Sequence, residues 1–184
     1  MSEAKFVSRA VRKKDAQALV TGKPVYTGDL VPAGALTVKL LRSPHARAWI
    51  EEIDCTAAMK IPGVVAIYTW QDVPQSRFTT AGQTYPEPSP YDRLILDRQI
   101  RCAGDPVAIV AAETPEAARK ALDRIKVRYQ VQEPLLDFTK AKDNPIVVHP
   151  EENFRTLCDV GTDASRNLCS TEQSEVGDVE AELA

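Results

Sequence analysis

The residues that could act as a nucleophile, a base or an acid pair are spaced in ways that argue against a shared site. Ser43 and His45 lie close together, but Ser43 lacks the flanking glycines of a nucleophile elbow and a recognisable acid partner. His149 is the only other histidine and lies far along the chain, so we expect a structural or interface role for His45. Glu51 and Glu52 stand in a predicted strand, where neighbours point to opposite faces. Their charges are expected to be solvated, and no catalytic residue is predicted.

The spacing of the cysteines and glycines also matches no common cofactor-binding motif. The four cysteines are Cys55, Cys102, Cys158 and Cys169. No pair of them has the Cys-x-x-Cys spacing of a zinc ribbon or an iron–sulfur site. Cys55 and Cys102 stand in apolar or strand-like surroundings, which predicts buried, inert thiols. The segment 104–106, Gly-Asp-Pro, predicts a turn without a phosphate-binding pattern.

Composition places the chain among ordinary globular domains. Its 184 residues are 43% hydrophobic and 27% charged, which allows a hydrophobic core without disulfides or metals. A net charge of −3 argues against a nucleic-acid partner. The longest apolar runs, 61–70 and 106–112, are shorter than the roughly 18 residues of a membrane span. No apolar segment follows the basic N-terminal residues, so no secretory signal is predicted and a cytoplasmic location is expected.

Charge is distributed unevenly and indicates a domain boundary. Residues 151–184 contain nine acids and two arginines, a local charge of −7. The same segment lacks apolar periodicity, and such a composition cannot order itself alone. We therefore expect an N-terminal lead-in over 1–20, a folded domain over 21–149 and an acidic linker over 150–184.

The sequence of the expected folded domain predicts strands with short helices between them. Strands are expected at 36–41, 48–53, 64–69, 95–102, 107–112 and 126–131. The nearly continuous apolar character of 64–69 and 107–112 predicts buried strands, the first on both faces. Thr114, Pro115 and an apolar stripe after them predict a helix that packs on a sheet. A strand, this helix and a further strand follow one another in the sequence, and we expect them to form a crossover unit. Shorter helices are expected in the first 20 residues and over 55–60. The fold class is α+β (mixed α/β), a small mixed sheet with packed helices.

A long polar segment over 71–93 predicts a loop inside the domain. Loops of this length are often functional, and this one offers three aromatic residues as contacts: Phe78, Tyr85 and Tyr91. Simple coverage of the surface is an equally good interpretation of the same residues.

Several short motifs, in one order, resemble the molybdenum hydroxylases, the family of xanthine dehydrogenase and aldehyde oxidase. They are the segments 12–15, 21–24, 26–29, 41–46, 62–65, 72–74, 102–108, 114–118 and 127–129. The resemblance spans roughly 12–137 and implies the α/β-hammerhead domain that opens the molybdenum-binding subunit. Residues 82–90 further resemble a bacterial subgroup of purine or xanthine oxidases, and 177–181 look like the family's linker into its next domain.

The resemblance implies hydroxylation of a purine or an aldehyde with oxygen from water. It implies a molybdopterin cofactor and a glutamate base in segments beyond this domain, with iron–sulfur clusters and FAD on other segments or subunits. The expected partners are therefore the molybdopterin-binding domains, the iron–sulfur and flavin subunits or domains, and the substrate. No catalytic, cofactor-binding or metal-binding residue is carried over, and the 184-residue fragment alone is expected to be inactive. A structural role is implied, with Phe78, Tyr85 or Tyr91 lining a substrate funnel.

A free-standing binding or adaptor domain of the same fold is the alternative. Its acidic tail would then be a docking segment for a partner. A domain that belongs to a larger enzyme should expose an apolar patch where its neighbours pack, whereas an adaptor should not.

Overall fold

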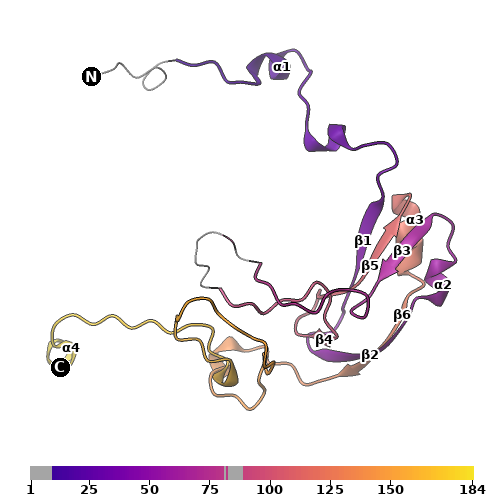
Figure 1. The fold of residues 1–184 in the computed structure, drawn as a ribbon. Helices are drawn as coiled ribbons and strands as arrows, with labels where there is room; N and C mark the ends of the chain where they lie inside the picture. The colour runs from indigo at the N-terminus through magenta and orange to yellow at the C-terminus, as the bar shows by residue number, and fades with distance from the viewer. Residues whose placement is uncertain (1–9, 81, 83–88) are drawn as a thin grey trace. The chain divides into compact units, whose positions relative to one another are not determined.

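The computed structural model describes residues 10–80, 82 and 89–184, and the chain divides into two units at Ala35 and Leu36. The first unit contains the helix α1 (Ala16–Val20) and the 3₁₀ helix η1 (Thr27–Leu30) (Figure 1). The short helix expected in the first 20 residues is thus confirmed.

Six strands of the second unit form two three-stranded sheets. One sheet has the order β1-β5-β3 and the other the order β4-β2-β6. The strands are β1 (Thr37–Arg42), β2 (Ala48–Asp54), β3 (Val64–Tyr68), β4 (Gln99–Ile100), β5 (Pro106–Ala112) and β6 (Lys126–Val131). All pairings among these strands are antiparallel. The predicted α+β class is confirmed, but two antiparallel sheets replace the single mixed sheet.

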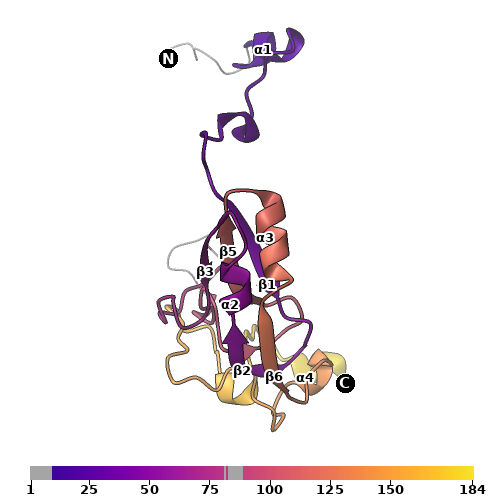
Figure 2. The ribbon, with the colours of Figure 1, turned by 90° about the vertical axis from the view of Figure 1, so that its right-hand side faces the viewer.

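The helix α3 (Pro115–Leu122) begins where the sequence predicts. The Thr114 hydroxyl oxygen accepts a hydrogen bond from the backbone N–H of Ala117 at 3.1 Å, which is an N-cap. The buried face of α3 consists of alanines, which pack on the small residues of β5 together with α2 (Thr56–Met59) (Figure 2). The predicted crossover unit is wrong. The strand after α3, β6, does not join β5 in its sheet, where the neighbours of β5 are β1 and β3. It pairs with β2 in the other sheet instead.

The two predicted buried strands differ in the structure. β5 is the central strand and is largely buried, as expected. β3 is an edge strand, and Val65 is 50% exposed and Tyr68 44% exposed. The expectation that residues 64–69 are buried on both faces is therefore wrong, because helices cover only one face of this sheet.

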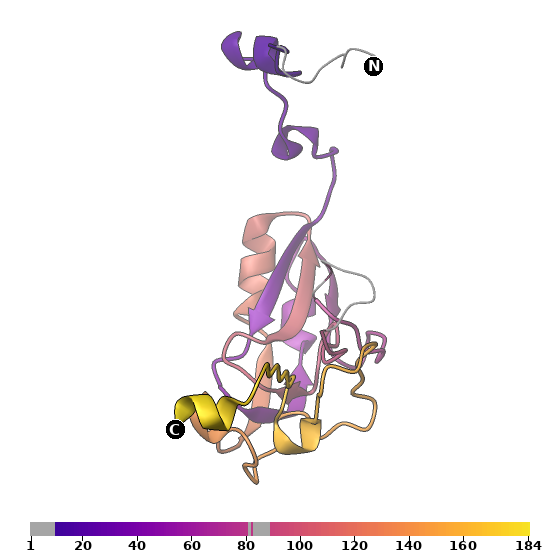
Figure 3. The same cartoon turned by 90° about the vertical axis from the view of Figure 1, so that its left-hand side faces the viewer.

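The second face of the β1-β5-β3 sheet is apolar. Cross-strand partners share a face, and the pairs join Val38 and Ala66 to Ala111, and Leu40 and Tyr68 to Ile109. These six residues are called the outer sheet face below. Helices α2 and α3 pack on the opposite side (Figure 3), and Val38 is 59% exposed.

An arginine between two tryptophans ties β2 to the segment before β4. The Arg98 guanidinium lies 5.0 Å from the ring centroids of both Trp49 and Trp70. Its Nε donates a hydrogen bond to the carbonyl of Ile50 at 2.9 Å, and the Ile50 N–H donates to the carbonyl of Arg98 at 2.9 Å. Because Trp49 lies in β2 and Trp70 follows β3, Arg98 contacts a residue of one sheet and a residue just after a strand of the other.

The chain after β6 contains the short helices η2 (Phe138–Lys140), η3 (Ala164–Arg166) and α4 (Val179–Leu183). Asn167 holds its middle part together: its side-chain amide donates to the carbonyls of Ala141 and Ile146 and accepts from the N–H of Val148. Among the described residues, none of the helices is both long and apolar enough to cross a membrane.

Candidate functional site

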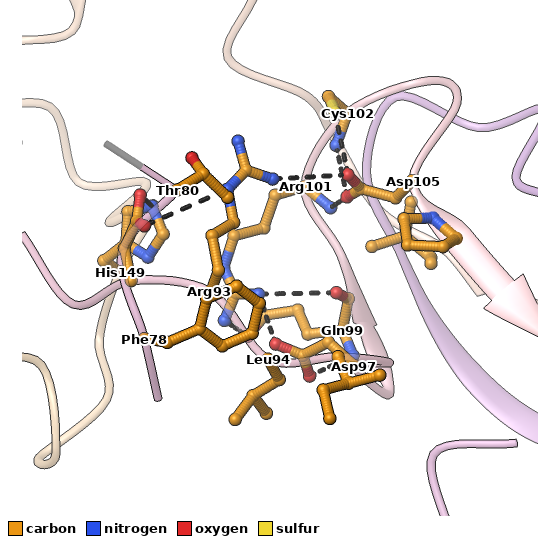
Figure 4. A pocket seen from close by; sticks show the side chains of 14 residues that line it. Phe78, Thr80, Arg93, Leu94, Asp97, Gln99, Arg101, Cys102, Asp105 and His149 are labelled. Carbon is orange, nitrogen blue, oxygen red and sulfur yellow. Dashed lines mark hydrogen bonds and ion pairs between the residues drawn. The ribbon is translucent and has the colours of Figure 1, made fainter. Parts of the chain in front are cut away.

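A pocket of about 450 Å³ lies beside the two ends of the long loop (Figure 4). Its walls are partly apolar and partly charged. The lining includes Phe78, Leu94, Ile95, Pro106, Asp92, Arg93, Asp97, Arg101, Asp105 and His149. This combination suits a small ligand with a flat apolar body and polar edges.

Backbone pairing fixes both ends of the loop beside this pocket. Phe78 and Arg93 exchange hydrogen bonds of 2.9 and 3.1 Å, and the N–H of Tyr91 donates to the carbonyl of Arg155 at 2.8 Å. Phe78 and residues 91–93 are called the loop base below. The sequence predicts only a loop here, because pairs this short leave no periodic pattern.

The three predicted funnel residues have different positions. The side chain of Phe78 lines the pocket. Tyr91 packs against Arg155, whose guanidinium lies 4.9 Å from the ring centroid. Tyr85 lies outside the described residues. Phe78 is therefore the one of the three that the described structure brings to the pocket.

A buried cluster of charges lies next to the loop base. Glu151 is ion-paired with Arg101 and with Arg77, the latter at 3.3 Å, and Arg101 also pairs with Asp97 at 2.6 Å. The side chains of Arg77, Arg101 and Glu151 are only 6%, 13% and 14% exposed. Arg77, Arg101 and Glu151 are called the clasp below. Sequence reasoning missed them, since they are far apart along the chain and form no motif.

His149 packs against the clasp as a neutral side chain. Its Nδ1 lies 3.4 Å from Glu151 and its Nε2 lies 3.9 Å from Asp92. Burial lowers the pKa of His149 to about 4, and the positive charge of Arg101 adds to this effect, which the negative charge of Asp92 only partly offsets. At neutral pH the imidazole is therefore uncharged.

The turn at the rim of the pocket is confirmed, and it exposes a thiol. Gly104 adopts a φ of +94°, and its N–H donates to the carbonyl of Ser43. The Cys102 thiol donates a hydrogen bond to the Asp105 carboxylate at 2.9 Å, which raises the pKa of the thiol and keeps it protonated. Cys102 is exposed and Cys55 half-buried, so the prediction that Cys102 is buried is wrong.

The residues with nucleophile or acid chemistry have structural contacts. The Ser43 hydroxyl accepts a hydrogen bond from the N–H of His45 at 3.0 Å, and the His45 ring packs edge-on against Tyr129. Glu51 and Glu52 both pair with Arg128, at 2.9 and 3.2 Å. A register shift between Ile50 and Glu52 lets adjacent residues reach one cation, so their expected opposite orientation is wrong.

No group of three or more histidine, cysteine or acidic residues suited to a metal ion occurs within 10–80, 82 and 89–184. Charged groups of the pocket wall are instead paired within the protein, Arg93 with Asp105 and Arg101 with Asp97, whereas the buried Nδ1 of His149 has no hydrogen-bond partner among the described residues. The arrangement can recognise a ligand, and it contains no set of described side chains that would hold a metal.

Comparisons with known proteins agree with this architecture. Residues 21–133 match the family model of the aldehyde oxidase and xanthine dehydrogenase a/b hammerhead domain. A probable hypoxanthine oxidase, XdhD, of Escherichia coli (strain K12) is 42% identical over 151 residues, which are 81% of this chain and 16% of the relative. The chain thus spans about one sixth of the length of this relative.

Two solved structures share the fold. The aldehyde oxidoreductase of Desulfovibrio gigas matches with a TM-score of 0.62 and 31% identity, over 74% of this chain and 16% of that one. Quinoline 2-oxidoreductase of Pseudomonas putida 86 matches with a TM-score of 0.61 and 32% identity, over 71% and 17%. With the family model covering residues 21–133, the chain belongs to the aldehyde oxidase and xanthine dehydrogenase family of molybdenum hydroxylases and contains its α/β-hammerhead domain.

Proposed function

We propose that this chain is the hammerhead segment of a larger xanthine dehydrogenase-like oxidoreductase that hydroxylates a purine or an aldehyde with oxygen from water. The observation that carries the proposal is the 42% identity to the relative named as a probable hypoxanthine oxidase. In the larger enzyme the segment has a structural role, packing against the molybdopterin-binding domains.

The outer sheet face supports this role. Val38, Leu40 and Tyr68 expose apolar surface on a sheet whose other side is covered by helices. Contiguous apolar patches on a soluble domain mark sites where another surface packs. Such a face favours a domain inside a larger assembly over a free-standing adaptor.

The cofactors belong, in this proposal, to other parts of the enzyme. Molybdopterin is bound by segments beyond this chain, and iron–sulfur clusters and FAD by other segments or subunits. The 184-residue chain by itself is then inactive. The division into a lead-in over 1–20, the hammerhead domain over 21–149 and a linker over 150–184 is part of the same proposal, as is a cytoplasmic location.

The size of the native polypeptide tests the proposal. We expect tagging of the chromosomal copy and intact-mass analysis to give a product much larger than the 20.2 kDa of this chain, and the purified assembly to oxidise hypoxanthine or xanthine. A native product near 20.2 kDa would contradict the proposal and favour the adaptor.

The pocket beside the loop base is the proposed wall of the substrate funnel. Phe78 offers an aromatic face beside polar groups, as a flat heterocycle requires. In the complete enzyme, Phe78→Ala should raise the KM for the purine about twofold to tenfold, because an aromatic stack contributes about 0.5–1.5 kcal/mol.

Tyr91→Ala and Tyr85→Ala extend this test, with a smaller effect expected for Tyr91, whose ring packs against Arg155. Steady-state kinetics measure all three variants. Phe138→Ala, which removes an exposed ring on η2, is the matched control and should leave KM unchanged. Unchanged kinetics in all three funnel variants would remove the funnel from the proposal.

A further inference from the structure

We propose that Glu151 is a positioning residue: the clasp holds the loop base in place and thereby sets where Phe78 stands in the pocket. The inference rests on the proposed function and adds a determinant of substrate recognition to it. It assigns this task to a residue in the acidic segment after the hammerhead domain.

Arg77 is the centre of the arrangement. Its Nη1 donates a hydrogen bond to the carbonyl of Asp92 at 2.8 Å, and its Nε donates to the side chain of Asn153 at 2.6 Å. One guanidinium therefore joins the first end of the loop, the second end of the loop and the segment 151–155. Since the side chain of Arg77 is 6% exposed, solvent screens these contacts little.

Glu151 connects this guanidinium to the second sheet. Its Oε1 contacts both Arg77 and Arg101, and Arg101 directly follows β4 (Gln99–Ile100). Arg101 is itself held by Asp97 and by the side-chain carbonyl of Gln99 at 3.1 Å. A carboxylate between two arginines is thus the link from the sheet to the loop base.

The backbone continues the same connection to Phe78. Arg155 accepts the hydrogen bond of the Tyr91 N–H, and Arg93 pairs with Phe78. Without the Glu151 charge, Arg77 is left buried without its carboxylate partner, which destabilises the buried position of Arg77. Phe78 is adjacent to Arg77 in sequence, so a shift of Arg77 displaces Phe78 as well. Removal of the Glu151 charge should therefore loosen Phe78.

Hydrogen exchange of the 184-residue chain tests the clasp directly. Glu151→Gln should speed exchange of the Phe78, Tyr91 and Arg93 amides at least about tenfold and leave the amides of β5 unchanged. Glu152→Gln removes a neighbouring exposed charge and is the matched control, with no change expected. Unchanged exchange at the loop base in Glu151→Gln would overturn the proposal.

A milder variant keeps the test decisive if Glu151→Gln destabilises the whole domain. If Glu151→Gln also speeds exchange throughout β5, Asn153→Ala decides, since it removes only the hydrogen bond from Arg77 Nε. A smaller acceleration confined to the same three amides supports the clasp, and no acceleration there overturns it.

Kinetics of the complete enzyme test the positioning of Phe78. Glu151→Gln should raise the purine KM about threefold to tenfold with kcat nearly unchanged. Glu151→Asp keeps the charge and should give a KM between those of the parent and of Glu151→Gln. In the Phe78→Ala background, Glu151→Gln should raise KM less than it does in the parent, because part of its effect passes through Phe78.

The two possible failures are distinguishable. Faster exchange with an unchanged KM, in an enzyme that oxidises purines, overturns the positioning role and leaves the proposed function standing. Absence of purine or aldehyde oxidation by the unsubstituted enzyme overturns the function and the substrate role that rests on it, while the exchange data still show whether the clasp holds the loop base.

Discussion

Replacement of Ile50 by alanine is expected to lower the free energy of unfolding by about 2–5 kcal/mol. Ile50 is fully buried in β2 and packs with Ala48, Ile100 and Val107. The truncation removes apolar contacts and leaves a cavity between strands that cannot close around it. Because small domains are stable by about 5–15 kcal/mol in total, this one change should remove a large share of the stability.

Urea unfolding of the 184-residue chain measures the effect. Val131→Ala, on the adjacent strand β6 and 60% exposed, is the matched control and should stay within about 0.5 kcal/mol of the parent. A loss below about 1 kcal/mol for Ile50→Ala would show that the two sheets do not share the packed core described here.

Acid should weaken the fold through His149. The pKa of this side chain is about 4 in the folded chain, against 6.5 for a free histidine. As pH falls through 6.5, the unfolded chain takes up a proton that the folded chain refuses, so stability is lost between pH 6.5 and about 4. Below that range both states are protonated and His149 contributes no further loss. The full effect is up to about 3 kcal/mol.

The difference between two stability profiles isolates this effect. His149→Gln should show a flatter dependence of the unfolding free energy on pH in that window than the parent. Parallel profiles for the parent and His149→Gln would contradict a buried neutral imidazole beside the clasp.

Local signals account for the elements that the sequence predicts well. Thr114 and Pro115 set the start of α3 by capping, and the apolar stripe after them sets its buried face. β5 is recognised by a continuous apolar run, and its central place in the sheet agrees with that run. These features depend on neighbours in sequence, which a single chain displays directly.

Pairing between segments that are distant in sequence accounts for the features that the sequence predicts wrongly or not at all. Residues 64–69 have the same apolar character as β5, but the order β1-β5-β3 places them at an edge. The register shift that brings Glu51 and Glu52 to one arginine depends on β6. The clasp depends on three segments meeting, and no residue type or spacing within any one of them indicates that meeting.

The stack around Arg98 gives this chain a built-in optical reporter. Trp49 and Trp70 are its two tryptophans, and both rings lie 5.0 Å from the same guanidinium. Indole emission responds to nearby charge and to water, so the tryptophan fluorescence of the chain originates beside one guanidinium. Any event that moves Arg98 away from the two indoles changes the wavelength and intensity of that emission, without a label or an added probe.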